Sequence, residues 1–312
     1  MLLFYEDKPD TDMEGEARMS MHRDIAVSGS LDSLEQYSSH AFIPVPQSSP
    51  ASCDGSLKVE NASSWTYCGP LLSAQSKNLP PSFHIWAAGT LSQPLILLER
   101  LLPLLRFLQA FLTAAGARHY WLTIRATRPN NDYDTPRWHT DEDFFAATSE
   151  ANGLDFGSSN KSKCWKLATT LLGPPTLFLK NNAKALRRLQ QTKMNQRFQM
   201  GDHTCTSIRC LGCATYTDTV RQSLADSLAE EEVEMFSSGE VAFFRTGADR
   251  GAVHSEPKCD TDRIFVNIIP GTEDDLKRLM NRFGMTYPRA WCLGNPVGFI
   301  PSDEAESLAP LS

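Results

Sequence analysis

A chain of 312 residues can form one large domain or two small ones with a sizeable hydrophobic core, so its size does not exclude an enzyme. Its 37 acidic and 30 basic side chains give a formal net charge of −7, which opposes general attraction to nucleic acid or to an anionic membrane. We therefore expect a small-molecule substrate or a protein partner, and neither nucleic acid nor membrane.

The cysteines and the first residues bear on the cellular compartment. Eight cysteines are spread irregularly, and the opening segment MLLFYEDKPD has no basic region followed by an apolar run. We expect reduced thiols and a cytoplasmic protein. The most apolar segment, residues 95–115, carries polar residues every three or four positions, which predicts an amphipathic surface helix rather than a membrane span.

Three regions follow from composition. Residues 1–80 are rich in Ser, Pro and acids, which predicts an irregular, partly disordered N-terminal arm. Residues 81–290 carry the periodic segments and are expected to form the main domain, and residues 291–312 a C-terminal tail. Within the main domain we expect a helical insertion at about 181–236.

The first half of the main domain begins with the helix at 95–115, which Gly116 would end. A strand is predicted at 119–127, followed by the turn-rich RPNNDYDTP. Residues 164–180 read as two strands separated by Gly173-Pro174-Pro175. A basic helix is expected over 181–200.

The second half begins with an acidic helix expected at 219–236. Strands are predicted at 239–247 and 262–271. A closing helix follows, with Thr272 as N-cap, Asp275 three residues later and Gly284 beyond its end. Because the strands come in two blocks without βαβ alternation, we predict a mainly β, α+β fold: an antiparallel sheet architecture with peripheral helices.

One constellation of residues points to metal chemistry. His139 and Asp141 are two positions apart, so on an extended segment both side chains point to the same face. His254, where a strand passes into a loop, would complete a set of two histidines and one carboxylate, which suits a non-haem Fe(II) oxygenase. Nine residues later, Arg263 would supply a bidentate clamp for a dicarboxylate co-substrate.

The order of these motifs resembles that of the Fe(II)/2-oxoglutarate-dependent dioxygenases over roughly residues 119–271. The shared features are the His-x-Asp pair, a long gap, GEVAFF, a histidine and an arginine at the head of the next strand. The segment GPPTLFL also looks like the Gly-x-x-Thr-x-Phe element of that family. The resemblance implies a double-stranded β-helix, or jelly roll, with the metal at one open end.

The resemblance further implies an oxidoreductase that uses Fe(II), 2-oxoglutarate and O2 to oxidise a substrate C–H bond, releasing succinate and CO2. His139, Asp141 and His254 would hold the iron and be the catalytic residues. Arg263 would bind the co-substrate, whereas Lys166 or Lys180 remain alternatives. On the parity of their strands, Thr170 and Asn267 are also assigned to the co-substrate.

The same parity argument selects Arg125, Thr127 and Lys166 as substrate-binding residues. Cationic side chains at the site favour a small carboxylated metabolite, such as an amino acid or an intermediate of specialised metabolism. Two alternatives stay open: a protein-directed hydroxylase of the same chemistry, and a non-catalytic jelly-roll scaffold.

A second group of possible metal ligands is His203, Cys205, Cys210 and Cys213, in GDHTCTSIRCLGC. Four such ligands are able to hold zinc, but the segment has no second Cys-x2-Cys pair. Reduced, packed cysteines are the preferred interpretation.

Overall fold

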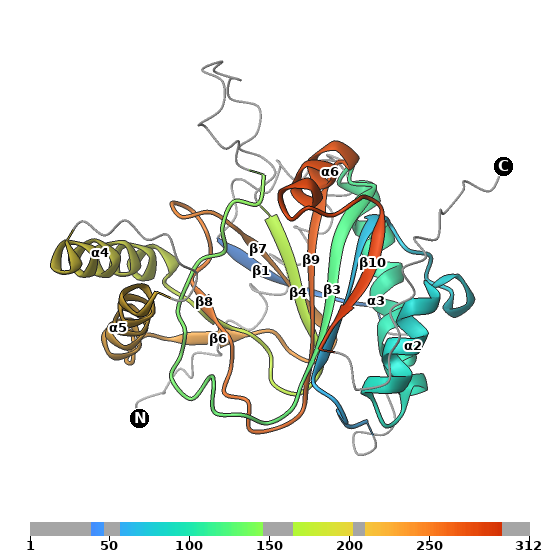
Figure 1. Ribbon diagram of the computed structural model, residues 1–312, viewed down its shortest axis with the longest axis horizontal. Helices are drawn as coiled ribbons and strands as arrows, with labels where there is room; N and C mark the ends of the chain where they lie inside the picture. The colour runs from blue at the N-terminus through green and yellow to red at the C-terminus, as the bar shows by residue number, and fades with distance from the viewer. Residues whose placement is uncertain (1–38, 47–56, 146–164, 202–209, 295–312) are drawn as a thin grey trace, which may run out of the picture.

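The computed structural model describes residues 39–46, 57–145, 165–201 and 210–294. In these ranges the chain forms two antiparallel β-sheets, and helices lie against the outer face of each one (Figure 1). The described residues contain a seven-stranded sheet, a three-stranded sheet and five α-helices. The protein is therefore of the mixed α+β class.

The large sheet has the strand order β1-β7-β4-β9-β3-β2-β10, and every neighbouring pair is antiparallel. Its strands, in that order, are His40–Pro44, Glu240–Arg245, Trp165–Leu172, Arg263–Gly271, His119–Thr127, Ser63–Pro70 and Arg289–Leu293. Strands far apart in the sequence are thus neighbours, because pairing satisfies their backbone hydrogen bonds.

The small sheet has the order β6-β5-β8, with strands Val233–Met235, Leu177–Leu179 and His254–Ser255. An isolated antiparallel bridge between His139 and His254 extends it by one more segment. The chain therefore passes repeatedly between the two sheets from β3 to β9.

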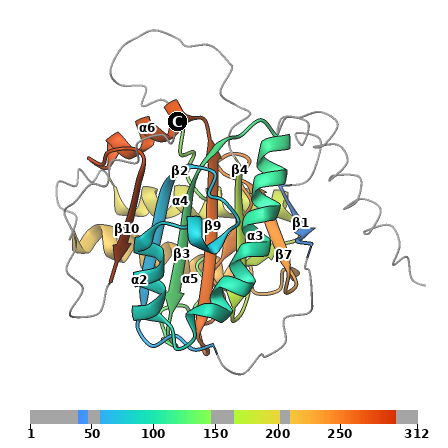
Figure 2. The same cartoon turned by 90° about the vertical axis from the view of Figure 1, so that its right-hand side faces the viewer.

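Helices α2 (Pro81–Thr90) and α3 (Pro94–Ala114) cover one face of the large sheet (Figure 2). A short 3-10 helix, η2, spans Ser76–Asn78 just before them. Side chains alternate along each strand, so on β3 the buried Leu122 and Ile124 face the helices whereas Thr123 and Arg125 face the other way. This layer contains the main hydrophobic core.

The opposite face of the large sheet packs against the small sheet. Phe42 of β1, Phe244 of β7 and Ala168 of β4 meet Phe178 of β5 in a buried cluster. Phe178 makes an edge contact with Phe244 at a centroid distance of 5.3 Å. The small sheet therefore covers the β1–β7–β4 side of this face.

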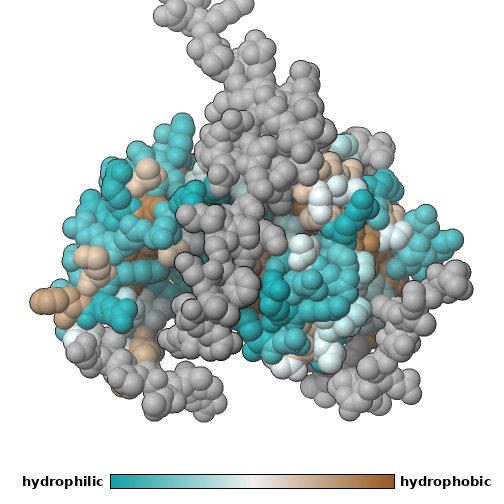
Figure 3. Space-filling view, turned by 90° about the horizontal axis from the view of Figure 1, so that it is seen from above, coloured by the Kyte–Doolittle hydropathy of each residue, from teal (hydrophilic) through white to brown (hydrophobic). Residues whose placement is uncertain are grey.

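Helices α4 (Asn182–Met200) and α5 (Leu211–Ser227) pack on the outer face of the small sheet through Leu189 and Leu224. Seen from above, the surface over these helices is mostly hydrophilic, with a few hydrophobic residues at its outer end (Figure 3). Among the described residues, no helix combines the length and apolar character needed to cross a bilayer.

Helix α6 (Glu273–Arg282) packs on β2 and β3 through Leu276 and Met280. It begins as predicted: the Thr272 side chain accepts from the Asp275 backbone, and the Asp275 carboxylate accepts from the Thr272 backbone. Gly284, at φ +67°, follows its end.

Several predicted elements are confirmed. The strand at 119–127 has the predicted bounds, and the helix predicted at 95–115 is α3. The two strands expected within 164–180 are β4 and β5, and the basic helix is α4.

Two expectations were wrong in part. The acidic helix predicted at 219–236 ends early: α5 stops at Ser227, and Val233–Met235 forms β6 because it pairs with β5. The arm expected to be irregular at 1–80 contains two strands of the large sheet: β1 pairs with β7, and β2 pairs with β3. Residues 1–38 and 47–56 lie outside the described residues, and the domain boundaries remain predictions.

Candidate metal centre

His139, Asp141 and His254 lie together between the two sheets. One ligand atom from each residue lies within 4.8 Å of the others. Two backbone hydrogen bonds hold the histidines side by side: His139 N–H donates to the His254 carbonyl at 3.0 Å, and His254 N–H donates to the His139 carbonyl at 2.9 Å. Within the described ranges, this is the group of His, Cys, Asp or Glu side chains that could hold a metal ion.

Backbone carbonyls fix both imidazole rings. His139 Nδ1 lies 2.6 Å from the Arg137 carbonyl and His254 Nδ1 lies 2.9 Å from the Ala252 carbonyl. With a proton on each Nδ1, each Nε2 carries the lone pair that a metal requires. The donor set of two neutral imidazoles and one carboxylate therefore fits Fe(II) or a similar divalent ion.

Burial and neighbouring charges keep His254 and Asp141 in their ligating forms. Burial, followed by the neighbouring His139, lowers the pKa of His254 to about 4, so its ring is neutral at pH 7. Burial alone would raise the pKa of Asp141, but the nearby cations, Lys166 above all, outweigh it and lower that pKa below its usual value. Lys166 Nζ lies 2.8 Å from Asp141 Oδ2.

Arg263 is buried beside this centre with 4% of its surface exposed. Its Nε donates to the Pro174 carbonyl at 2.9 Å, and one Nη donates to Thr176 Oγ1 at 3.3 Å. Thr176 directly precedes β5, whose Phe178 pairs with His254. Burial, and then the charge of Arg125, lower the pKa of Arg263 to about 10, so it stays cationic at neutral pH.

Two predicted co-substrate residues have unsatisfied polar atoms. Thr170 Oγ1 and Asn267 Oδ1 are buried and make no hydrogen bond to any residue that the structure describes. Thr170 pairs with Phe265, and Asn267 lies two residues further along β9, on the same side as Arg263. Buried polar atoms without partners cost free energy, so a polar molecule bound between the sheets would satisfy them.

The predicted substrate residues lie in three different settings. Lys166 is paired with Asp141, a member of the candidate metal centre. Arg125 lies 4.0 Å from Glu256 and over the Phe265 ring at 5.5 Å. Thr127 ends β3, aligned with Arg263.

Glu256 is a site residue that the sequence analysis missed. Burial raises the pKa of its carboxyl, but His139 and Arg125 outweigh burial and lower that pKa, so Glu256 is ionised near the candidate metal centre. Its position two residues after His254 in an extended segment was the available signal, since residues at i and i+2 share a face.

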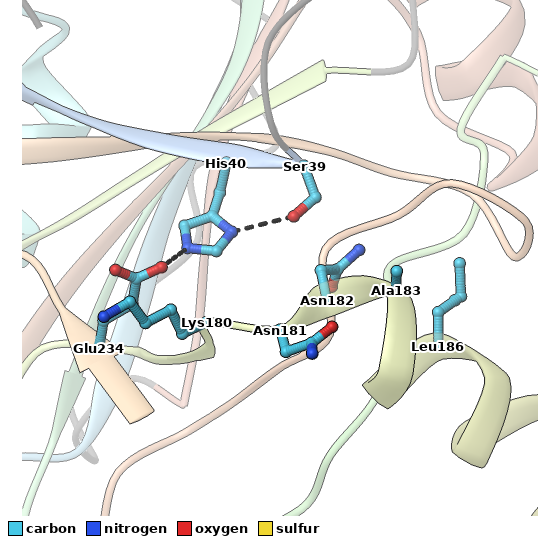
Figure 4. Close-up of a pocket in the computed structure, with 8 residues that line it drawn as sticks. All are labelled: Ser39, His40, Lys180, Asn181, Asn182, Ala183, Leu186 and Glu234. Carbon is cyan, nitrogen blue, oxygen red and sulfur yellow. Dashed lines mark hydrogen bonds and ion pairs between the residues drawn. The ribbon is translucent and has the colours of Figure 1, made fainter. Parts of the chain in front are cut away.

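A pocket of about 560 Å³ lies beside the small sheet at the start of α4 (Figure 4). His40 lies there between Ser39 and Glu234, at 3.1 and 2.5 Å (Figure 4). The His40 ring stacks on Phe178 at 4.7 Å, and Phe178 stacks on His254 at 5.7 Å. Phe178 therefore packs between the rings of His40 and His254 and supports the position of the His254 ring.

The cysteine-rich cluster falls only partly within the described residues. Cys210 is the residue before α5 and Cys213 lies in its first turn. His203 and Cys205 lie outside the described residues, so the interpretation of this cluster stays a prediction.

Comparison with known proteins does not name a family for this chain. No protein-family model and no curated protein matches it.

Proposed function

We propose that this protein is an Fe(II)- and 2-oxoglutarate-dependent oxygenase that acts on a small carboxylated metabolite. The observation that carries the proposal is the meeting of His139, Asp141 and His254 within 4.8 Å, with both imidazoles oriented through Nδ1. Two histidines and one carboxylate on one side of an ion leave positions for co-substrate and O2.

The sheet topology supports a double-stranded β-helix. The central strands of the large sheet run β7-β4-β9-β3, and the small sheet with its bridge runs β6-β5-β8 and then residue 139. In chain order, the segments alternate between the sheets except at the β5–β6 step, where both strands belong to the small one. In a double-stranded β-helix one chain forms both facing sheets, so its strands must alternate between them in this way.

The surroundings of Arg263 support a site for the co-substrate. A dicarboxylate needs a fixed cation at its far end, and Arg263 is buried, cationic and held by Pro174 and Thr176. The Thr170 hydroxyl, buried without a hydrogen bond to the described residues, would donate to a carboxylate of the co-substrate on the same face. Arg263 is preferred over Lys166, which is engaged by Asp141, and over Lys180, which pairs with Glu232 at the surface.

The chain's own groups have distinct parts in the proposed chemistry. Bound Fe(II), with 2-oxoglutarate and O2, would supply an oxidant able to take hydrogen from a C–H bond while 2-oxoglutarate becomes succinate and CO2. His139 and His254 offer imidazole nitrogens as ligands, and Asp141 offers a carboxylate whose charge Lys166 balances when no metal is bound. The two-sheet enclosure limits the access of water to the oxidant.

An anaerobic titration of metal-free protein with Fe(II) and 2-oxoglutarate tests the proposal. We expect a visible charge-transfer band from the chelate. The band should be lost in His139→Ala and retained in His84→Ala, which removes an imidazole from α2 that hydrogen-bonds Ser76.

A second variant tests the co-substrate clamp. Arg263→Lys keeps the charge but loses the bidentate geometry, so the band should require about tenfold more 2-oxoglutarate. A folded parent protein without any band would refute the oxygenase and favour the scaffold alternative.

A further inference from the structure

A groove of about 380 Å³ crosses the same face of the large sheet as the metal centre. It lies over β9, β3, β2 and β10, beside the part that the small sheet covers. Its volume is in the range of pockets that hold small organic molecules. The residues that line it divide into an aromatic wall and a polar end.

Three aromatic side chains form the wall. Trp121 meets Trp291 edge to face at a centroid distance of 5.2 Å, and it meets Phe283 at 5.9 Å. Trp121 Nε1 donates to Thr123 Oγ1 at 3.3 Å, which fixes its indole ring. Phe283 is 62% exposed although it lines the groove. Such a wall favours a flat, apolar ring, because aromatic pairs add binding energy beyond simple burial.

Arg125 supplies the charge at the polar end. Its side chain is 41% exposed, and its only recorded ion pair within the described residues is a long one, 4.0 Å to Glu256. Arg125 and Arg263 both lie over the Phe265 ring, at 5.5 and 4.5 Å. Two guanidinium groups therefore meet around one aromatic ring, and the local excess of positive charge favours an anionic ligand.

Asn267 adds a hydrogen-bonding requirement. It lines the groove, and its Oδ1 is buried without a hydrogen-bond partner among the described residues. A ligand N–H or O–H would satisfy that atom. Asn267 stands on β9 four residues after Arg263 and on the same face of the sheet, so it connects the groove with the side that carries Arg263.

We propose that this groove binds the substrate and that the substrate is a small aromatic carboxylic acid with a hydrogen-bond donor on its ring. The ring lies against Trp121 and Trp291, the carboxylate pairs with Arg125, and the donor reaches Asn267. Oxidation of the bound acid rests on the proposed oxygenase function, whereas its binding to the groove requires no metal. Glu256 links the two sites, because it pairs with Arg125 and lies two residues after His254.

Calorimetric titration of the metal-free protein tests the binding with three probes. Indole-3-propanoate has the ring, the donor and the carboxylate; its primary amide lacks the charge; hexanoate lacks the ring. We expect indole-3-propanoate to bind about tenfold more tightly than either of the others. Equal affinities, or no binding of indole-3-propanoate, would overturn the proposal.

Variants locate the bound molecule. Arg125→Gln should weaken indole-3-propanoate about tenfold and leave its amide unchanged. Arg221→Gln, the same change on the exposed face of α5, should alter neither. Phe283→Ala removes an exposed part of the wall and should weaken both indole probes several-fold. If Arg263→Lys abolished the binding of indole-3-propanoate and Arg125→Gln did not, the carboxylate would lie at the co-substrate site. That result would overturn its assignment to Arg125.

A final arm separates this inference from the proposed function. With Fe(II), 2-oxoglutarate and O2, indole-3-propanoate should increase succinate release in the parent and not in Arg125→Gln. Binding to the groove without any Fe(II)-2-oxoglutarate band would reject the oxygenase but keep the groove. A band without binding of indole-3-propanoate would keep the oxygenase and reject the groove.

Discussion

Lys166 and Asp141 form a buried ion pair inside the candidate metal centre, with Nζ 2.8 Å from Oδ2. Lys166 comes from β4 of the large sheet, and Asp141 from the segment beyond the His139–His254 bridge. The ammonium group therefore neutralises a carboxylate that the proposed metal ion would also neutralise. This double role leads to a prediction about stability and metal affinity together.

Lys166→Met should destabilise the metal-free protein by about 3 kcal/mol, because it leaves a buried carboxylate without its cation. The same variant should bind Mn(II) more tightly than the parent, since the competing positive charge is gone. Urea unfolding with and without Mn(II) measures both effects. Lys180→Met, at a largely exposed pair with Glu232, should change stability by less than about 1 kcal/mol. A Lys166 variant with weaker metal binding would contradict this account.

His254 makes the stability of the metal-free protein depend on pH. Its folded-state pKa is lowered to about 4, whereas in the unfolded chain it is about 6.5. Between these values the unfolded chain binds more protons, so stability falls as the pH drops from about 6.5 towards 4, by at most about 3 kcal/mol. The lowered pKa of Asp141 acts in the same direction at still lower pH.

Urea unfolding of the metal-free protein at pH 7, 6 and 5 measures this dependence. His254→Gln has no titrating ring and should show a shallower slope. A parent and a variant with the same slope would mean that His254 is not held neutral by burial.

Loss of an imidazole ligand should be more severe than loss of a supporting contact. His254→Ala leaves one imidazole and one carboxylate, so Fe(II) affinity should fall by more than the 10- to ~100-fold typical of outer contacts. The metal content of protein reconstituted with Fe(II) under anaerobic conditions measures this. His84→Ala should retain the parent content, and equal retention by His254→Ala would identify the wrong ligand.

Gly173 controls the position of Arg263. It has φ +79°, and a Cβ there would lie 2.3 Å from the Asp262 carbonyl and 3.1 Å from Arg263 Cα. Gly173→Ala should therefore shift the start of β9, lower the affinity for 2-oxoglutarate and destabilise the protein by about 2 kcal/mol or more.

Gly201→Ala is the matched control for this change. Gly201 has φ +68°, but a Cβ there would meet no atom of the described residues within 4 Å. It should cost about 1 kcal/mol for the left-handed backbone and leave 2-oxoglutarate affinity unchanged. Thermal unfolding and the chelate band measure the two quantities; equal effects of both substitutions would rule out a role for the close approach to Arg263.

The elements predicted well are those that local interactions determine. The strand His119–Thr127 alternates buried and half-buried side chains along its whole length. Helix α6 begins with a capping box between Thr272 and Asp275, which lie within four consecutive residues and need no distant partner. Local hydrogen bonding and periodicity are sufficient to specify such segments.

The elements predicted poorly depend on distant partners. Val233–Met235 follows a run of acids typical of a helix, yet it forms β6 because β5 offers an edge to pair with. Ser63–Pro70 lies in a stretch that looked irregular, yet β3 and β10 pair with it on both sides. Tertiary pairing overrides weak local preferences of this kind.

The sequence by itself determined which side chains were available for a metal centre, because the His139-x-Asp141 spacing places both on one face of an extended segment. The sequence also suggested His254 as the third member, but only the tertiary structure decided how it is brought there, through two backbone hydrogen bonds across the bridge, and that Lys166 balances Asp141. It also decided that Glu256, Arg125 and Phe265 lie between this centre and an aromatic groove. Such contacts depend on the register of strands far apart in the chain, which local sequence does not encode.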